Sequence, residues 1–235
     1  MKLVLIGGGE IGRSNTPYEI KEIDETIVKM ANKEKPVLLF IGLASSYSDS
    51  YYDVIKNNYK QLGCIPTYLK KNNLIHNPDL VKQKFKDADI IYVGGGDTLK
   101  LLEKIKEYNL KSLIDEAINQ NKVLVGISAG AILFSKKGYS DAYILRGEKE
   151  TYEFISGLGY TNLSISPHFE EDSEKTNQLI DELKKGKEEV YALENGTALI
   201  IEDDKLKTIH AIKKAKIYKV NYKNEFIKEE IKRPC

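Results

Sequence analysis

The chain has 235 residues, which fits one large domain, and 41% of them are hydrophobic, which excludes disorder for most of its length. Its 36 basic residues nearly balance 35 acidic ones, so the net charge of +1 indicates neither nucleic acid nor an anionic membrane as partner. No apolar run approaches the roughly 20 residues that span a bilayer. Met1 leads directly into a strand-like run without a signal-peptide pattern, and we expect a cytoplasmic protein.

Short apolar runs alternate with amphipathic stretches in the first two-thirds of the chain. The apolar runs predict strands over residues 2–7, 36–43, 64–69, 89–95 and 122–128. Helical spacing of apolar residues predicts helices over residues 16–33, 48–63, 97–108 and 110–121. In the first of these, Thr16 is the expected N-cap and Pro17 the first helical residue. The alternation predicts an α/β fold with a doubly wound, mainly parallel sheet.

The last part of the chain, after about residue 187, has a different pattern. Short strand-like runs are separated by Asn-Gly, Asp-Asp and lysine-rich turns, and they predict C-terminal β-hairpins that close one side of the sheet. No linker rich in proline, glycine or serine interrupts the sequence. We therefore treat residues 1–235 as a single domain.

The first predicted strand ends in Gly7-Gly8-Gly9-Glu10-Ile11-Gly12, which satisfies the dinucleotide-binding pattern G-x-G-x-x-G. In a dinucleotide turn the helix begins inside the pattern, whereas "RSNTP" separates Gly12 from the predicted helix. The acidic residue expected at the end of the second strand is also missing. We interpret these glycines as a strand end whose backbone passes close beside the functional site, and we expect no cofactor.

The fifth predicted strand runs into Gly126-Ile127-Ser128-Ala129-Gly130 and then an apolar stretch. This is the G-x-S-x-G nucleophile elbow in its required context of strand, sharp turn and helix. Small neighbours let the turn form, and the N–H group of Ala129 points toward a developing oxyanion. The pattern favours a catalytic serine, and the alternative is a tight packing turn between strand and helix.

A serine nucleophile needs a base, and the chain has three histidines. His168 follows an apolar run and a proline, which places it at a strand end, so it is the candidate base. We expect His76 in a polar loop and His210 in a half-buried hairpin strand. Glu194, at the end of another predicted strand, is the candidate carboxylate that orients the imidazole, and Asp141 competes for that role.

Four motifs in order, "YVGGGDTLKLL", "GISAGAILF", "SPHF" and "ALENGTALI", resemble those of peptidase E (α-aspartyl dipeptidase) and its relatives, including cyanophycinase. The resemblance covers most of the chain. It implies a flavodoxin-like sheet, similar to class I glutamine amidotransferase domains, and a Ser-His-Glu triad. It assigns Ser128 as nucleophile, His168 as base and Glu194 as orienting acid.

The resemblance also implies further site residues. It places the backbone N–H groups of Gly95 and Ala129 in the oxyanion hole and gives Asp141 a supporting role. Aspartate-selecting relatives carry a substrate-binding arginine on the helix after the histidine, whereas this chain has Thr176 at that position with Lys175 beside it. Lysine supplies charge without the bidentate fork, so aspartyl specificity is not expected to follow automatically.

The leading hypothesis is a serine peptidase that cleaves dipeptides or short peptides through an acyl-enzyme. The alternatives are an α/β-hydrolase esterase with His210 as base, and a non-catalytic nucleotide- or metabolite-binding protein. The expected partner is a small peptide substrate, with no nucleic acid and no membrane, in a monomer or homodimer. The histidines and cysteines lack metal-ligand spacing, and Cys64 and Cys235 are expected as reduced thiols.

Overall fold

The computed structural model describes residues 1–186 and 188–232, and its strands form two sheets. The seven-stranded sheet has the order β11-β10-β1-β5-β4-β2-β3. Its members are β1 (Lys2–Ile6), β2 (Val37–Ile41), β3 (Ile65–Tyr68), β4 (Ile90–Val93), β5 (Val123–Ile127), β10 (Thr197–Glu202) and β11 (Lys205–His210). The first five are parallel, and β10 and β11 add an antiparallel hairpin beside β1. The five strands predicted from apolar runs are therefore confirmed.

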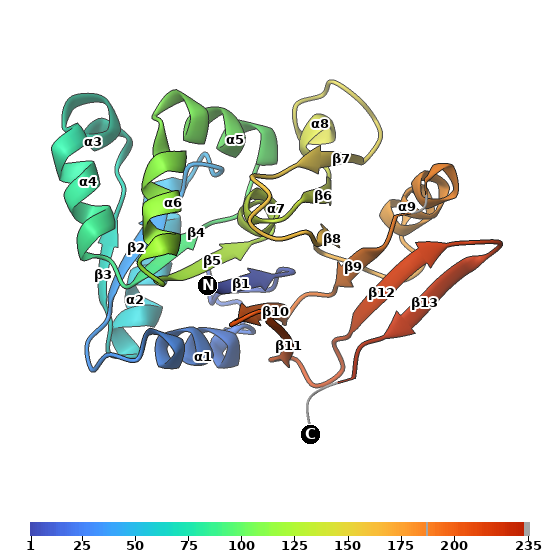
Figure 1. The fold of residues 1–235 in the computed structure, drawn as a ribbon, viewed down its shortest axis with the longest axis horizontal. Helices are drawn as coiled ribbons and strands as arrows, with labels where there is room; N and C mark the ends of the chain where they lie inside the picture. Colours follow the sequence, from blue (N-terminus) through green and yellow to red (C-terminus); the bar gives the residue numbers. More distant parts are fainter. Residues whose placement is uncertain (187, 233–235) are drawn as a thin grey trace.

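Helices cover both faces of this sheet, as Figure 1 shows. They are α1 (Lys21–Ala31), α2 (Ser48–Gln61), α3 (Lys71–His76), α4 (Pro78–Asp87), α5 (Thr98–Glu107), α6 (Leu110–Asn119) and α7 (Ala129–Phe134). Successive strand residues point to opposite faces, so Val4 packs with the core under α1 and α2. Leu3 and Leu5 pack with the core under α4 to α7. This doubly wound arrangement confirms the predicted fold class.

The second sheet has six strands in the order β13-β12-β9-β8-β6-β7. They are β6 (Lys137–Ser140), β7 (Glu153–Ser156), β8 (Ser164–Ser166), β9 (Val190–Leu193), β12 (Ile217–Tyr222) and β13 (Phe226–Glu230), with the short α8 (Ala142–Leu145) between β6 and β7. Helix α9 (Glu174–Lys185) packs on this sheet through Leu179 and Leu183. The predicted C-terminal hairpins are present, but β12 and β13 extend this second sheet, whereas β10 and β11 extend the first.

The start of the first helix differs from the prediction. Helix α1 begins at Lys21, and Thr16 and Pro17 lie in the preceding loop. Thr16 donates its hydroxyl to Glu10 Oε2 at 3.1 Å, and Tyr18 forms a bridge with Ile11. Tertiary contacts of the loop therefore use the residues that locally resemble a helix start.

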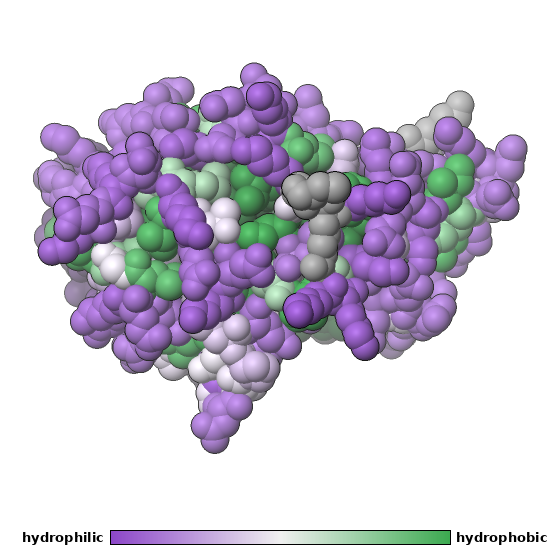
Figure 2. Space-filling view, turned by 90° about the horizontal axis from the view of Figure 1, so that it is seen from below, coloured by the Kyte–Doolittle hydropathy of each residue, from purple (hydrophilic) through white to green (hydrophobic). Residues whose placement is uncertain are grey.

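The surface is mainly polar. Figure 2 shows one face on which hydrophilic side chains surround small hydrophobic patches. Within residues 1–186 and 188–232, no helix has both the length and the apolar character needed to cross a bilayer. Cys64 is a free, buried thiol, and Cys235 lies outside the described residues.

Candidate active site

Ser128 lies at the sharp turn between β5 and α7. Its backbone has φ 55° and ψ −114°, a conformation that non-glycine residues rarely adopt and that is found where surrounding structure holds a functional side chain. The N–H group of Ser128 donates to Ile6 O at 3.0 Å, and its carbonyl accepts the N–H group of Ile132 at 3.0 Å. These bonds hold the turn between β1 and the first turn of α7.

Close backbone contacts explain why the first and last positions of the G-x-S-x-G motif are glycine. A Cβ on Gly126 would lie 2.2 Å from Gly130 O, and a Cβ on Gly130 would lie 2.2 Å from Val93 O. Both contacts are with backbone atoms, which cannot rotate away. The strand-to-helix turn therefore closes only with glycine at both positions.

Gly95, in the turn after β4, lies beside the serine. A Cβ at Gly95 would be 3.2 Å from Ser128 Cβ and 3.7 Å from Ser128 Oγ. Its N–H group donates to the buried Tyr51 hydroxyl over 3.5 Å, a long hydrogen bond. Ala129 is the first residue of α7, so its N–H group is one of those without a partner inside the helix. The two predicted oxyanion donors thus flank Ser128.

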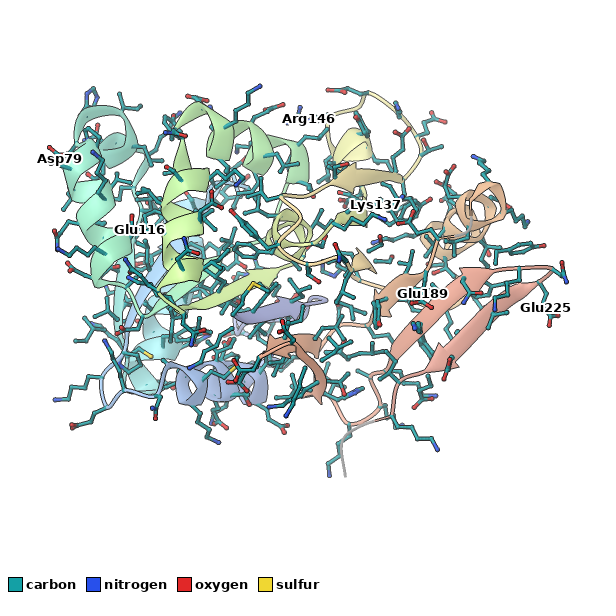
Figure 3. All side chains as sticks on the ribbon, viewed as in Figure 1. Asp79, Glu116, Lys137, Arg146, Glu189 and Glu225 are labelled. Carbon is teal, nitrogen blue, oxygen red and sulfur yellow. The ribbon has the colours of Figure 1, made fainter. Side chains whose placement is uncertain are left out.

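The turn after β4 is tied to the rest of the molecule by an ion pair that the sequence did not reveal. Arg146, labelled in Figure 3, donates from Nε to Asp97 Oδ2 at 2.9 Å and from its Nη atoms to Glu103. Asp97 also caps α5 by accepting the N–H group of Lys100. This network fixes the turn that carries Gly95.

His168 follows β8, and its Nε2 lies 2.9 Å from Ser128 Oγ. The predicted nucleophile and base are therefore brought together, although they come from different sheets. Part of the imidazole reaches solvent, but the surrounding protein desolvates the ring, and this desolvation followed by the Lys175 ammonium lowers the pKa of His168. The Asn195 hydrogen bond and the Asp141 charge act in the opposite direction. Near neutral pH the imidazole is therefore mainly in its neutral form.

Asn195, and not the predicted Glu194, contacts the imidazole. Its Oδ1 lies 2.8 Å from His168 Nδ1. Because Oδ1 only accepts, Nδ1 carries the proton and Nε2 is free to accept the Ser128 hydroxyl. Glu194 instead accepts the Lys216 N–H group at 2.9 Å. The sequence-based prediction chose Glu194 because it is charged. The Asn195-Gly196 turn that follows β9 was the local feature that could have indicated Asn195 instead.

The glycines that end β1 support the histidine. Gly7 O accepts the N–H group of His168 at 2.9 Å. A Cβ on Gly8, whose φ is +145°, would lie 2.3 Å from both Asn195 Oδ1 and His168 Cε1. The strand end therefore passes directly against the imidazole and the amide, as the interpretation of these glycines predicts.

A cavity of about 220 Å³ opens beside Ser128 and His168. Its charged lining residues are Asp141, Glu170, Glu174 and Lys175. Of the two predicted substrate-binding residues, Lys175 lines the cavity, whereas Thr176 is buried and donates its hydroxyl to Glu170 O at 2.7 Å. Asp141 lies in the cavity wall, and no hydrogen bond joins it to His168 among the described residues.

The other two histidines lie outside the site. His210 ends β11, and its Nδ1 lies 2.8 Å from Ala215 O. His76 ends α3, which replaces the loop expected there. The esterase alternative required His210 at the serine, and this geometry contradicts it.

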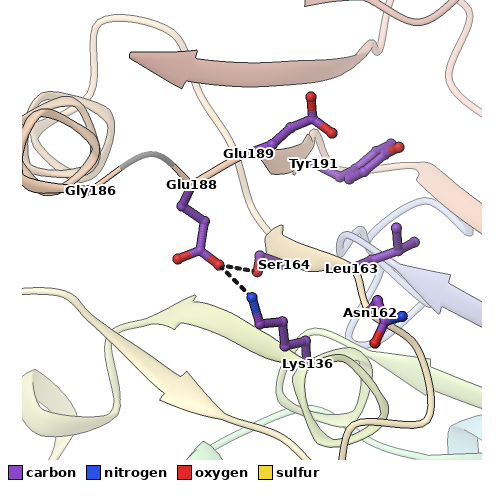
Figure 4. A pocket seen from close by; sticks show the side chains of 8 residues that line it. All are labelled: Lys136, Asn162, Leu163, Ser164, Gly186, Glu188, Glu189 and Tyr191. Carbon is purple, nitrogen blue, oxygen red and sulfur yellow. Dashed lines mark hydrogen bonds and ion pairs between the residues drawn. The ribbon is translucent and has the colours of Figure 1, made fainter. Parts of the chain in front are cut away.

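A larger depression, of about 450 Å³, lies at the amino-terminal ends of β8 and β9, opposite the strand ends that carry His168 and Asn195. Figure 4 shows Glu188 there, accepting the Ser164 hydroxyl at 2.6 Å and paired with Lys136 at 3.5 Å. Glu188 also pairs with Lys137, and Glu189 pairs with Lys219, so each carboxylate of this depression has a lysine partner. In the part of the chain that the structure describes, no group of three or more His, Cys, Asp or Glu residues could hold a metal ion.

Comparisons with known proteins identify the family and the fold of the chain. A sequence model of the family described as Peptidase family S51 matches residues 3–209. The chain is 31% identical over 227 residues to "Uncharacterized peptidase YgaJ" of Bacillus subtilis (strain 168), covering 93% of this chain and 91% of that protein. It is 30% identical to "Peptidase E" of Shewanella denitrificans over 130 residues, 54% of this chain and 51% of that protein. A crystal structure of a peptidase from an acI-B1 actinobacterium superposes with a TM-score of 0.73 at 22% identity, covering 100% of this chain and 95% of that one.

Proposed function

Since the chain belongs to peptidase family S51 and is a serine-type peptidase, we propose that it hydrolyses dipeptides or short peptides through an acyl-enzyme on Ser128. The observation that carries the proposal is the 2.9 Å contact between Ser128 Oγ and His168 Nε2 at a strained elbow. A serine in hydrogen-bond reach of a neutral imidazole, itself oriented by a third group, is the arrangement that nucleophilic acyl transfer needs.

In this proposal Ser128 Oγ attacks the peptide carbonyl while His168 Nε2 accepts the hydroxyl proton. Asn195 holds the imidazole in the tautomer that leaves Nε2 free, a role that we assign to it in place of Glu194. The C–N bond then breaks, and His168 returns the proton to the leaving amine. Water attacks the acyl-enzyme along the same path and regenerates Ser128.

The backbone N–H groups of Gly95 and Ala129 are the proposed oxyanion donors. The closeness of Gly95 to Ser128 and the position of Ala129 at the start of α7 support this assignment. The long contact between Gly95 and Tyr51 is weak enough to be exchanged for a bond to a developing oxyanion. One such donor contributes about 10²- to 10³-fold to the rate.

The cavity beside Ser128 is the proposed site for the acyl half of the substrate. Its volume of about 220 Å³ lies below the range of roughly 300–1,000 Å³ that is typical of drug-sized ligands, which favours a small substrate group. Asp141 lies in its wall, and we assign it a supporting electrostatic role because its charge raises the pKa of His168.

A fluorophosphonate probe tests the proposal, because it phosphonylates only an activated serine. We expect labelling of the wild-type protein and none of Ser128→Ala, with peptide hydrolysis lost in the same variant. Ser156→Ala is the matched control, because this exposed serine on β7 lies outside the site, and its labelling should equal that of the wild type. Labelling that persists in Ser128→Ala would overturn the proposal.

A further inference from the structure

The peptide unit between Pro167 and His168 is held at both ends. Its N–H group, on His168, donates to Gly7 O at 2.9 Å. Its carbonyl group, on Pro167, accepts a hydrogen bond from Lys175 Nζ at 2.5 Å. The two partners lie on different elements, the end of β1 and the first turn of α9.

This peptide unit carries the base in an unfavourable backbone conformation. His168 has φ +51°, in the left-handed region that residues with a Cβ avoid. Such a conformation persists only where the surrounding contacts impose it. Rotation of the peptide toward the right-handed region would move the imidazole away from Ser128 Oγ. The two hydrogen bonds oppose that rotation.

Lys175 is built into this position by the local fold. Ser173 caps α9 by accepting the Thr176 N–H group at 3.2 Å, and Thr176 donates its hydroxyl to Glu170 O. These bonds join the loop after His168 to the first turn of α9. The partly buried Lys175 side chain then extends back along the loop to Pro167, with its ammonium 5.6 Å from the Tyr152 ring centroid.

The ammonium of Lys175 forms no ion pair within residues 1–186 and 188–232. The other charged and titratable groups that line its cavity are Asp141 before α8, His168 and Glu170 after β8, Glu174 at the start of α9, Tyr139 on β6 and Tyr152 before β7. Lys175 therefore bonds the backbone carbonyl of Pro167, next to the candidate base, instead of a carboxylate. Its main polar contact is with the segment that carries His168.

We propose that Lys175 is a positioning residue that holds His168 in register with Ser128 through the Pro167 carbonyl. The proposal rests on the proposed function of Ser128 and His168. It gives Lys175 a role that is independent of any substrate charge, in contrast to a residue that only binds a substrate carboxylate.

The ammonium also has an electrostatic effect on the base. Its positive charge disfavours the imidazolium form and contributes to the lowered pKa of His168, while Asp141 opposes it. Removing the charge would raise the pKa of His168, so the acid limb of the activity profile would move to higher pH. Desolvation also lowers the pKa of Lys175 itself to about 8, so the ammonium is lost in mildly alkaline solution.

The test measures the second-order rate constant for phosphonylation of Ser128 by a small uncharged fluorophosphonate across pH. This probe has no carboxylate for Lys175 to bind. For Lys175→Met we expect a rate about 10-fold lower near neutral pH and an acid limb moved to higher pH. Lys175→Arg should restore most of the rate. Lys184→Met, on an exposed lysine of the same helix, should behave as the wild type.

A wild-type rate and pH profile in Lys175→Met, with only the KM for acidic peptides raised, would overturn the proposal and leave Lys175 as a substrate-binding residue. If Lys175→Met does not fold, Lys175→Gln takes its place, because its shorter side chain keeps a polar end but removes both the ammonium and its reach to the Pro167 carbonyl. A lower rate with the acid limb at higher pH supports the proposal, and a wild-type rate and pH profile overturn it. Absence of any wild-type labelling would instead contradict the proposed function.

Discussion

The two sheets supply the two halves of the candidate active site in different ways. The seven-stranded sheet contributes Ser128 and Gly95 from the ends of two parallel strands, β5 and β4. The six-stranded sheet contributes His168 and Asn195 from the ends of β8 and β9. Both pairs lie at carboxyl ends of neighbouring strands, where α/β proteins place their sites.

The two halves differ in what holds them. The serine half depends on close contacts within one short turn, such as those of Gly126 with Gly130, and on neighbouring strand residues such as Val93. The histidine half depends on contacts between segments far apart in sequence, such as the bond from His168 to Gly7. A short motif is therefore sufficient to identify the first half, whereas the second half is defined by which distant groups meet there.

The largest expected effect comes from removing the base. His168→Ala should lower kcat/KM about 10²- to 10⁴-fold, because proton transfer by a positioned group contributes that much. His210→Ala is the matched control, since its ring bonds Ala215 O outside the site, and it should keep activity within about threefold once folding is verified. The kcat/KM for peptide hydrolysis is measured with both purified variants. Comparable losses in the two would contradict the assignment of His168 as the base.

The next effect tests the contact between the two halves. Gly8→Ala introduces a Cβ 2.3 Å from Asn195 Oδ1 and His168 Cε1, so one of these groups must move. We expect phosphonylation of Ser128 to slow about 10²-fold. Gly12→Ala is the control for the positive φ alone, because its Cβ would meet only Tyr18 Cβ, at 3.7 Å. Equal rates in the two variants would show that the strand end does not support the imidazole.

A smaller effect separates the two neighbours at the end of β9. Asn195→Ala removes the acceptor on His168 Nδ1 and should lower kcat about 10- to 100-fold, with little change in KM. Glu194→Gln keeps the shape of the side chain that accepts the Lys216 N–H group and should leave kcat within about threefold. Steady-state kinetics on one peptide decide between them. The reverse order of effects would return the orienting role to Glu194.

The smallest effect on catalysis is expected from a substitution of Asp24, which lies in the core on the α1 side of the seven-stranded sheet. Asp24 is fully buried, bonds the Tyr18 and Tyr59 hydroxyls, and burial raises its pKa to about 7 from 3.8. Because the folded state holds this proton more tightly than the unfolded state, the contribution of Asp24 to stability is full below about pH 3.8. It is lost as the pH rises through about 7.

Asp24→Asn cannot titrate, so it isolates this dependence. The free energy of unfolding of the wild type minus that of Asp24→Asn should fall between about pH 4 and pH 7 and level off above it. Urea denaturation at several pH values measures the difference, while the labelling rate of folded protein should not change. A difference that is constant with pH would contradict the raised pKa.

The predictions from sequence succeeded where a signal was local. The apolar runs located the five parallel strands, and helical spacing located α2, α5 and α6 to within about two residues at each end. Ser128 was identifiable because two glycines and a strand-turn-helix pattern mark its turn within a few residues. His168 was identifiable because a proline and a strand end precede it, and because the chain offers only two other histidines.

Tertiary structure decided the choices between adjacent residues. Glu194 and Asn195 are neighbours after β9, but one meets the Lys216 backbone and the other meets His168. Likewise Lys175 reaches the site, whereas Thr176 turns into the loop. By itself the sequence placed Ser128 and His168, the candidate nucleophile and base, directly after strand ends, because hydrophobic periodicity and turn sterics act over a few residues. It could not determine which of two neighbours faces the imidazole, because that depends on backbone direction set by contacts with β1, the loop before β12 and α9.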